Sequence, residues 1–253
     1  MSTLPWKTVW IAGASSGIGR AVALLLARRG VHVAASARGI DALNALTAEG
    51  NGLISVHPLD VTDAKATYDI SKEIEAAHGP VDLALVSSGT WKPFKLGDIR
   101  TDAFADSMAV NYLGAVNMAA AVIADMQARG GGQIAFVSSV AGFFGLPKSA
   151  TYGPTKAALI NLAESLKTEL DGSGVAVSVV NPGFVATPMT ETNSFPMPFL
   201  MSPDKAAERI VDGLASGRFE VTFPRRLAWT MKALGLLPYP AFFWFVRKFV
   251  SRR

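Results

Sequence analysis

Short apolar runs alternate with longer segments of mixed polarity along most of this chain. Strands that are covered on both faces show continuous apolar runs instead of a strict apolar–polar alternation, as happens in parallel sheets. The runs therefore predict buried parallel strands. They cover residues 8–13, 31–37, 53–58, 81–88, 133–139 and 175–182.

The segments between these runs have helical patterns, and several end with glycine, a common residue at helix C-termini. Strands that alternate with helices predict right-handed βαβ units and a doubly wound α/β fold, with helices on both faces of the sheet. A shorter run at 218–223 predicts one more strand at an edge. The helical segments cover residues 17–30, 41–50, 63–79, 101–131 and 155–174.

The composition fits a single domain over residues 1–253, because half of the residues are apolar and only 17% are charged. The absence of cysteine excludes disulfides, thiolate nucleophiles and cysteine-based zinc sites. The three histidines are scattered without an H-x-x-x-H pairing, so we expect no metal site. The N-terminus lacks the pattern of a signal peptide, which favours a cytoplasmic protein.

A glycine-rich turn follows the first predicted strand. In doubly wound sheets, ligands bind outside the carboxyl ends of the strands. Glycines let the backbone turn tightly and approach a ligand, and the helix N-terminus behind them attracts a pyrophosphate. A glycine-rich turn without a ligand is the alternative, which the position between strand and helix disfavours. The turn places Gly13, Ser15, Ser16, Gly17, Ile18 and Gly19 at a nucleotide site.

The second predicted strand ends at Ala37, and Arg38 follows it. An NAD site needs a carboxylate here to accept bonds from the ribose hydroxyls, whereas a 2′-phosphate needs a cation. The sequence therefore favours NADP(H) over NAD(H). The alternative is an ordinary surface arginine at a strand end.

Ser139 follows the fifth predicted strand, 13 residues before Tyr152, and Lys156 lies four residues after Tyr152. A ketone that accepts a hydride becomes an alkoxide and needs a proton. Free tyrosine, with a pKa near 10, needs about 4 kcal/mol of preferential stabilisation of tyrosinate to act as a base at neutral pH. Lys156 supplies a nearby cation, and an oxidised nicotinamide adds another positive charge. Tyr152 then serves as general acid in reduction and general base in oxidation, and Ser139 holds the carbonyl oxygen.

The G-x-x-x-G-x-G turn and the Ser…Tyr-x-x-x-Lys pattern resemble the classical short-chain dehydrogenase/reductase family, whose fold is of the Rossmann type. The resemblance covers residues 7 to about 188. It implies that Asn111 completes a catalytic tetrad by fixing a water that relays protons to Lys156. It also implies dimers or tetramers. Further cofactor contacts implied by the family motifs are Asp60, Val61, Ser88, Gly89, Pro182, Gly183, Val185 and Thr187, with Thr187 placed to bond the nicotinamide carboxamide.

The chain departs from the family pattern at two neighbouring strand ends. Ala12 stands where the family usually has threonine, and Ser87 and Ser88 stand in a segment that is usually Asn-Asn-Ala-Gly. We expect the polar contact that usually links these turns to be rearranged, through a serine hydroxyl or a water. For Asp60, a loop residue ahead of a helix capped by Thr62 or Asp63 is the alternative interpretation.

Pro154 lies between Tyr152 and Lys156. Proline lacks an N–H group and is tolerated in the first turn of a helix. We therefore expect this helix to begin near residues 149–151, with Tyr152 in its opening turn. There the positive end of the helix dipole adds modestly to Lys156 in favouring tyrosinate.

Apolar residues dominate the segments expected to contact a substrate. These are 143–147 and 188–203, joined by Trp91 and Phe94. They favour an apolar small-molecule substrate. A lid that packs on the core for its own stability is the alternative.

The C-terminal extension, residues 224–253, combines aromatic residues with cations. From Arg218 to Arg253 there are eight Lys or Arg and one Glu, a net charge of +7, so the remainder carries −3 of the total of +4. Two prolines make it a poor transmembrane helix. Two short helices lying on a membrane surface are one interpretation, and a dimer contact or packing over the substrate cleft is the other. Nucleic acid is not an expected partner, because the segment has too few exposed polar residues to track a backbone.

Together these features predict an NADP-dependent oxidoreductase that interconverts a carbonyl and a secondary alcohol. The alternative is a catalytically idle NADP-binding protein that serves as a redox sensor or scaffold.

Overall fold

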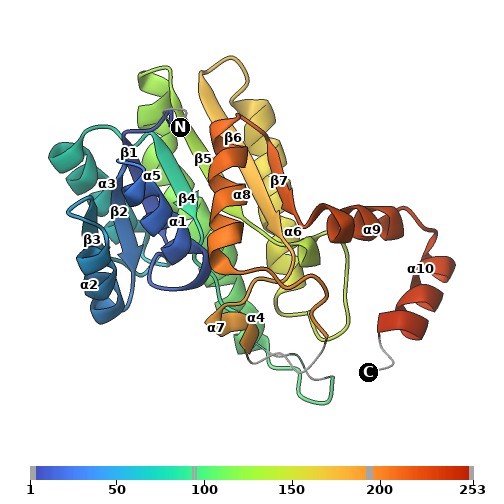
Figure 1. The fold of residues 1–253 in the computed structure, drawn as a ribbon. Coiled ribbons are helices and arrows are strands. Elements are labelled where there is room, and N and C mark those ends of the chain that lie inside the picture. Colours follow the sequence, from blue (N-terminus) through green and yellow to red (C-terminus); the bar gives the residue numbers. More distant parts are fainter. Residues whose placement is uncertain (1–3, 93, 95, 192–195, 251–253) are drawn as a thin grey trace.

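The computed structural model describes residues 4–92, 94, 96–191 and 196–250. Its centre is one parallel sheet of seven strands in the order β3-β2-β1-β4-β5-β6-β7 (Figure 1). The six predicted strands and the additional edge strand, β7, are confirmed. The strands are β1 Thr8–Ala12, β2 His32–Ala37, β3 Ile54–Pro58, β4 Leu83–Val86, β5 Gly132–Val137, β6 Val175–Pro182 and β7 Glu220–Phe223.

Helices connect the strands and cover both faces of the sheet (Figure 1). A π-helical turn, Ala109–Leu113, joins α4 to α5, and a second one, Val246–Val250, continues α10. A 3-10 turn, Val140–Gly142, follows β5. The α-helices are α1 Gly17–Arg28, α2 Ile40–Glu49, α3 Ala64–His78, α4 Thr101–Met108, α5 Gly114–Ala128, α6 Gly153–Glu169, α7 Pro188–Glu191, α8 Pro203–Ala215, α9 Arg225–Gly235 and α10 Tyr239–Phe245.

The sheet separates two apolar cores, and β1 contributes to both. Val9 and Ile11 pack with residues of α1, α2 and α8 on one face. Trp10 and Ala12 pack with residues of α3, α5 and α6 on the other face. Successive side chains of a strand point to opposite faces. Because both faces are buried, all of these positions are apolar, which explains the continuous run in the sequence.

Helix α8 was not among the helices predicted from the sequence, although its signals are present. The Ser202 hydroxyl accepts a hydrogen bond from Lys205 N at 3.4 Å, and Pro203 opens the helix. Ala206, Ile210 and Leu214 are buried at helical spacing and pack toward α1. Serine as N-cap followed by proline in the first turn is typical of a helix start.

The continuous helical segment Thr101–Ala128 is long and apolar enough to span a membrane by length and composition, and it is the one such helix among the described residues. Its α5 portion packs on α3 and on the sheet, and Met118, Val122 and Met126 belong to the core. Core packing therefore accounts for its apolar composition.

Candidate functional site

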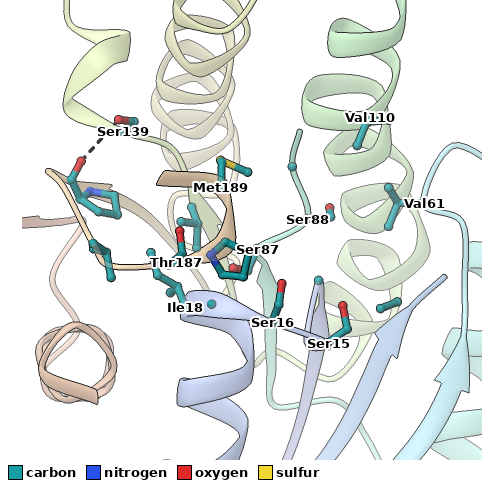
Figure 2. Close-up of a pocket in the computed structure, with 18 of the residues that line it drawn as sticks. Ser15, Ser16, Ile18, Val61, Ser87, Ser88, Val110, Ser139, Thr187 and Met189 are labelled. Atoms are coloured by element: carbon teal, nitrogen blue, oxygen red, sulfur yellow. Dashed lines mark hydrogen bonds between the residues drawn. The ribbon is translucent and has the colours of Figure 1, made fainter. Parts of the chain in front are cut away.

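A cavity of about 360 Å³ lies at the carboxyl ends of the strands (Figure 2). The strand order reverses next to β1, between β1 and β4, which is where doubly wound sheets bind nucleotides. Every predicted site residue lines this cavity except Gly19 and Asn111. Residues that the prediction did not assign to a site also line it: Ala37, Gly39, Leu59, Ser87, Val110, Val137, Ser138, Pro188, Met189 and Thr190.

The glycine-rich turn allows the backbone to approach other segments closely. Gly13 has φ +84°, and a Cβ there would lie 2.5 Å from Ser88 N. A Cβ on Gly17 would lie 3.1 Å from the Thr187 methyl group, so the turn meets the segment after β6. Gly19 does not line the cavity, and a Cβ there would overlap the Gly13 carbonyl oxygen. The side chains of Ser15 and Ser16 point toward the cavity (Figure 2).

Arg38 and Asp60 line one end of the cavity. Hydrogen bonds from Thr62, through its backbone N–H at 3.0 Å and its hydroxyl at 2.8 Å, lower the pKa of Asp60, and the charge of Arg38 adds to this effect. Among the described residues Arg38 has no ion pair, so its charge remains available to a ligand. The helix that follows is capped by Asp63, which accepts from Ala66 N at 2.9 Å.

The two departures from the family pattern lie side by side, because β1 pairs with β4. The link between them is a backbone bond from Ser87 N to Ala12 O at 2.9 Å. The expected contact through a serine hydroxyl is not what joins Ser88 to this turn: the Ser88 hydroxyl is buried without a hydrogen-bond partner among the described residues. Among the described residues, the hydrogen bond that joins these strand ends is therefore a backbone one, and the alternative link through a water stays a prediction.

Asn111 lies in the π-helical turn between α4 and α5 and is fully buried. Its Oδ1 accepts from Thr90 N at 2.7 Å, and its Nδ2 donates to Thr90 O and to the Thr155 hydroxyl, both at 3.0 Å. The side chain therefore fastens the segment after β4 to α6. Its predicted role in a water relay stays a prediction.

The predicted catalytic residues meet at the start of α6. Lys156 Nζ lies 5.4 Å from the centre of the Tyr152 ring and donates to Val137 O at 2.8 Å. Ser139 Oγ accepts from Ala141 N at 3.1 Å and donates to Pro182 O at 3.4 Å (Figure 2). The segments after β5 and β6 are thus joined beside the tyrosine.

In the protein without a cofactor, burial has the largest effect on the pKa values of Tyr152 and Lys156. It raises the pKa of Tyr152 to about 12, and the Ser139 hydroxyl opposes this only in part. Burial also lowers the pKa of Lys156 to about 8. The sequence led us to expect a lowered tyrosine pKa. That expectation counted on the charge of an oxidised nicotinamide as well as on Lys156, so it stays a prediction for the protein with cofactor bound; in the protein alone the loss of water around Tyr152 has the larger effect.

Helix α6 begins at Gly153, later than the predicted start at 149–151, and Tyr152 is its N-cap residue. Tyr152 N and Gly153 N both bond to Ser149 O, at 3.1 and 2.7 Å, so a turn occupies the positions expected to be helical. The first helical bond runs from Lys156 N to Tyr152 O at 3.2 Å. Pro154 falls in the first turn, as expected.

The segments expected to contact a substrate divide into two groups. Met189 lines the cavity. Segment 143–147 does not line it; instead, Phe144 packs edge-to-face on Phe242 of α10 with ring centres 5.1 Å apart. Phe94 packs on Phe104 of α4 at 6.1 Å. Residues 192–195 of segment 188–203 lie outside the described residues.

The histidines, although scattered in the sequence, are not all isolated in the fold. The rings of His32 and His78 stack with centres 3.7 Å apart, at the end of the sheet opposite the cavity. Within the described ranges, no group of three or more His, Asp or Glu is placed to hold a metal ion.

Comparisons with known proteins find similar sequences and similar folds along most of the chain. An uncharacterized oxidoreductase of Myxococcus xanthus is 39% identical over 245 residues, which cover 96% of this chain and 97% of the relative. A short-chain dehydrogenase from Streptomyces avermitilis matches with a TM-score of 0.84 at 26% identity, over 98% of both chains. The structure of ElxO with NADP bound matches with a TM-score of 0.77 at 25% identity, over 86% of this chain and 97% of ElxO.

A model of the short chain dehydrogenase family matches residues 7–196, which is most of the chain. This span contains the glycine-rich turn as well as Ser139, Tyr152 and Lys156. The chain therefore belongs to the classical short-chain dehydrogenase/reductase family of oxidoreductases.

Proposed function

We propose that this protein is an NADP(H)-dependent oxidoreductase that interconverts a carbonyl and a secondary alcohol on an apolar small molecule. One observation carries the proposal: Ser139, Tyr152 and Lys156 line the same cavity as the glycine-rich turn. The proposed proton donor and the proposed dinucleotide site therefore face the same cavity.

The residues of the cavity fit a dinucleotide. The lack of side chains at Gly13 and Gly17 lets the turn pack closely against Ser88 and Thr187 at the wall of the cavity. Helix α1 begins at Gly17, so the N–H groups of its first turn lie beside the glycine-rich turn. The buried Ser88 hydroxyl, which has no partner among the described residues, offers a further polar contact. When bound, a reduced nicotinamide supplies the hydride.

A preference for NADP(H) rests on the cation at the end of β2. Arg38 has no ion pair among the described residues, and Ala37 and Gly39 beside it carry no carboxylate that would repel a 2′-phosphate. Guanidinium groups bind phosphates through charge-assisted hydrogen bonds. The similar structure of ElxO has NADP bound, which agrees with this choice.

The protein supplies the proton for reduction. A pKa of about 12 keeps Tyr152 protonated at neutral pH, so its hydroxyl is a proton donor for the alkoxide oxygen formed from a carbonyl. The Ser139 hydroxyl donates to Pro182 O at 3.4 Å, a long hydrogen bond that it can exchange for one to the substrate oxygen. Lys156, whose pKa is about 8, is mostly a cation at pH 7 and stabilises the tyrosinate left behind.

The substrate is expected to be apolar. Val110, Val185 and Met189 line the cavity. Met189 belongs to α7, a helix of one turn in the segment after β6. Methionine and β-branched side chains favour contact with hydrocarbon over contact with a charged group.

The test is a panel of apolar ketones and secondary alcohols with NADPH or NADP⁺, followed by nucleotide absorbance. We expect turnover by the full chain and a loss of at least about a hundredfold in kcat for Tyr152→Phe, with nucleotide affinity retained. Tyr68→Phe, at an exposed tyrosine, is the matched control and should keep full activity. Nucleotide binding without turnover of any substrate would favour the redox sensor or scaffold.

A further inference from the structure

Helices α9 and α10 with the following π-helical turn, residues 225–250, form a segment that we call the C-terminal arm. It projects from the side of the molecule beyond β7 (Figure 1). Only Ala228, Phe242 and Val246 of the arm are buried. Phe242 packs on Phe144 at 5.1 Å, which fixes the arm beside the segment that follows Ser139.

The rest of the arm exposes large apolar side chains to an unusual degree. Trp229 is 70% exposed, Leu236 86% and Tyr239 75%. Single exposed apolar residues are ordinary on a protein surface, but a contiguous group of this kind marks a site of interaction. The group also includes Leu237, Phe243, Trp244, Phe245, Phe249 and Val250.

All the Lys, Arg, Asp and Glu positions of the arm are occupied by the basic residues Lys and Arg, so its charge is positive. Residues 225–250 contain Arg225, Arg226, Lys232, Arg247 and Lys248, and no Asp or Glu. Lys232 forms an ion pair with Glu220 of β7, which ties α9 to the sheet. Among the described residues, the other four have no carboxylate partner.

Aromatic rings and cations are interleaved on the arm. Lys248 Nζ lies 4.7 Å from the centre of the Trp244 ring and 5.4 Å from that of Phe249. Tryptophan, tyrosine, lysine and arginine are the residues that gather at the boundary between lipid headgroups and acyl chains. A helix that lies in this boundary has an apolar aromatic face and a basic polar face.

We propose that the C-terminal arm binds this protein to the surface of an anionic lipid bilayer. The seven residues of α10 and the five of its π-helical turn are too short to cross a hydrocarbon core of about 30 Å. The arm therefore lies in the plane of the headgroups. A symmetric contact between the arms of two copies is disfavoured, because it would place four unpaired cations against four others.

The experiment uses the full chain and vesicles of phosphatidylcholine alone or with about one third phosphatidylglycerol. Co-sedimentation measures binding. Emission comes from all five tryptophans, and a shift on adding vesicles reports chiefly on the exposed Trp229 and Trp244. We expect binding to the anionic vesicles to be at least about tenfold tighter than to phosphatidylcholine, with a blue shift of emission, and to weaken in high salt. Failure of the chain to sediment with anionic vesicles would overturn the proposal.

Two pairs of substitutions separate the apolar and the charged contributions. Trp244→Ser with Phe249→Ser removes exposed rings, and Arg247→Glu with Lys248→Glu reverses charge; each pair should weaken anionic binding at least about tenfold. The matched controls are Tyr68→Ser with Leu96→Ser, and Lys167→Glu with Arg209→Glu, all at exposed positions outside the arm.

Sedimentation velocity without lipid tests whether a second copy of the chain binds to the arm. If the full chain is a dimer and the Trp244→Ser, Phe249→Ser variant is a monomer, the arm is a contact between copies and the proposal fails. Oligomeric state that is the same in both, together with loss of vesicle binding in the variant, supports the proposal.

Discussion

Lys156 Nζ lies 5.4 Å from the centre of the Tyr152 ring, one turn along α6; Lys156 is buried, and Tyr152 is half-buried at the wall of the cavity. Because both groups have lost water, their neutral forms are favoured: the pKa of Tyr152 rises to about 12 and that of Lys156 falls to about 8. Tyr152 is therefore protonated at neutral pH, and Lys156 titrates close to physiological pH. A protonated Tyr152 is the state that the proposed reduction requires of its proton donor.

The reduction rate should consequently depend on the charge of Lys156. We expect kcat/KM for ketone reduction by NADPH to fall about tenfold per pH unit above pH 8, where Lys156 loses its proton. Lys156→Arg keeps a cation at high pH, so its activity, although lower, should show the decline at a higher pH. A pH profile from 6 to 10 for both proteins measures this. A decline at the same pH in Lys156→Arg would assign it to another group.

Cofactor choice should depend on the end of β2. Arg38→Gln removes the cation expected to bind the 2′-phosphate, so KM for NADPH should rise at least about tenfold while KM for NADH changes little. Arg28→Gln, at an exposed arginine in the last turn of α1, is the matched control. Steady-state kinetics with both nucleotides provide the measurement. Equal increases for NADPH and NADH would mean that Arg38 contacts a part common to both.

Much of the fold was predictable because a parallel sheet covered on both faces leaves a continuous apolar signature. Val9, Trp10 and Ile11 show this, since all three are fully buried, on alternate faces of the sheet. Helix α8 was missed even though Ser202 and Pro203 mark its start. The meeting of Ser139, Tyr152 and Lys156 at one cavity was predictable because their spacing along the chain reflects one strand end and one helix start.

Features that depend on contacts between distant segments were not readable. The sequence does not show that Asn111 would sit in a π-helical turn and bond to Thr90 and Thr155, because those partners lie 21 and 44 residues away. The raised pKa of Tyr152 likewise depends on burial by several elements. The stacking of His32 on His78 joins a strand start to the end of α3.

Gly19 should be intolerant of a side chain for a packing reason. Gly-to-Ala substitution inside a helix ordinarily stabilises a protein by about 1 kcal/mol. Here an added Cβ would overlap the Gly13 carbonyl, a backbone group that cannot turn away. We therefore expect Gly19→Ala to lower the free energy of unfolding by about 1–3 kcal/mol and to weaken nucleotide binding. Urea denaturation measures the first effect, and titration with NADPH the second.

Gly131→Ala is the control for Gly19→Ala, because no heavy atom lies within 4 Å of the Cβ position there. It should leave nucleotide affinity unchanged. A Gly19→Ala protein as stable as the original would show that the glycine-rich turn can move to make room, contrary to the close contact in the structure.

Stability should decline in mild acid because of His32. Burial, with the charges of His78 and His57, lowers the pKa of His32 to about 4, and its Nδ1 is buried without a hydrogen-bond partner among the described residues. Above pH 6.5 both folded and unfolded chains carry a neutral His32, so it has no effect there. Between pH 6.5 and 4, His32 is protonated in the unfolded chain but stays neutral in the folded protein. The free energy of unfolding therefore decreases as the pH falls through this range.

Replacement of His32 removes this linkage. After allowance for the partial exposure of the ring, we expect the loss of unfolding free energy between pH 7 and pH 5 to be smaller by about 1 kcal/mol in His32→Gln than in the original protein. Urea denaturation at the two pH values, with equal slopes in both proteins, provides the comparison. The same loss in both proteins would mean that carboxyl groups, and not the stacked histidines, set the acid limit, because only His32 differs between them.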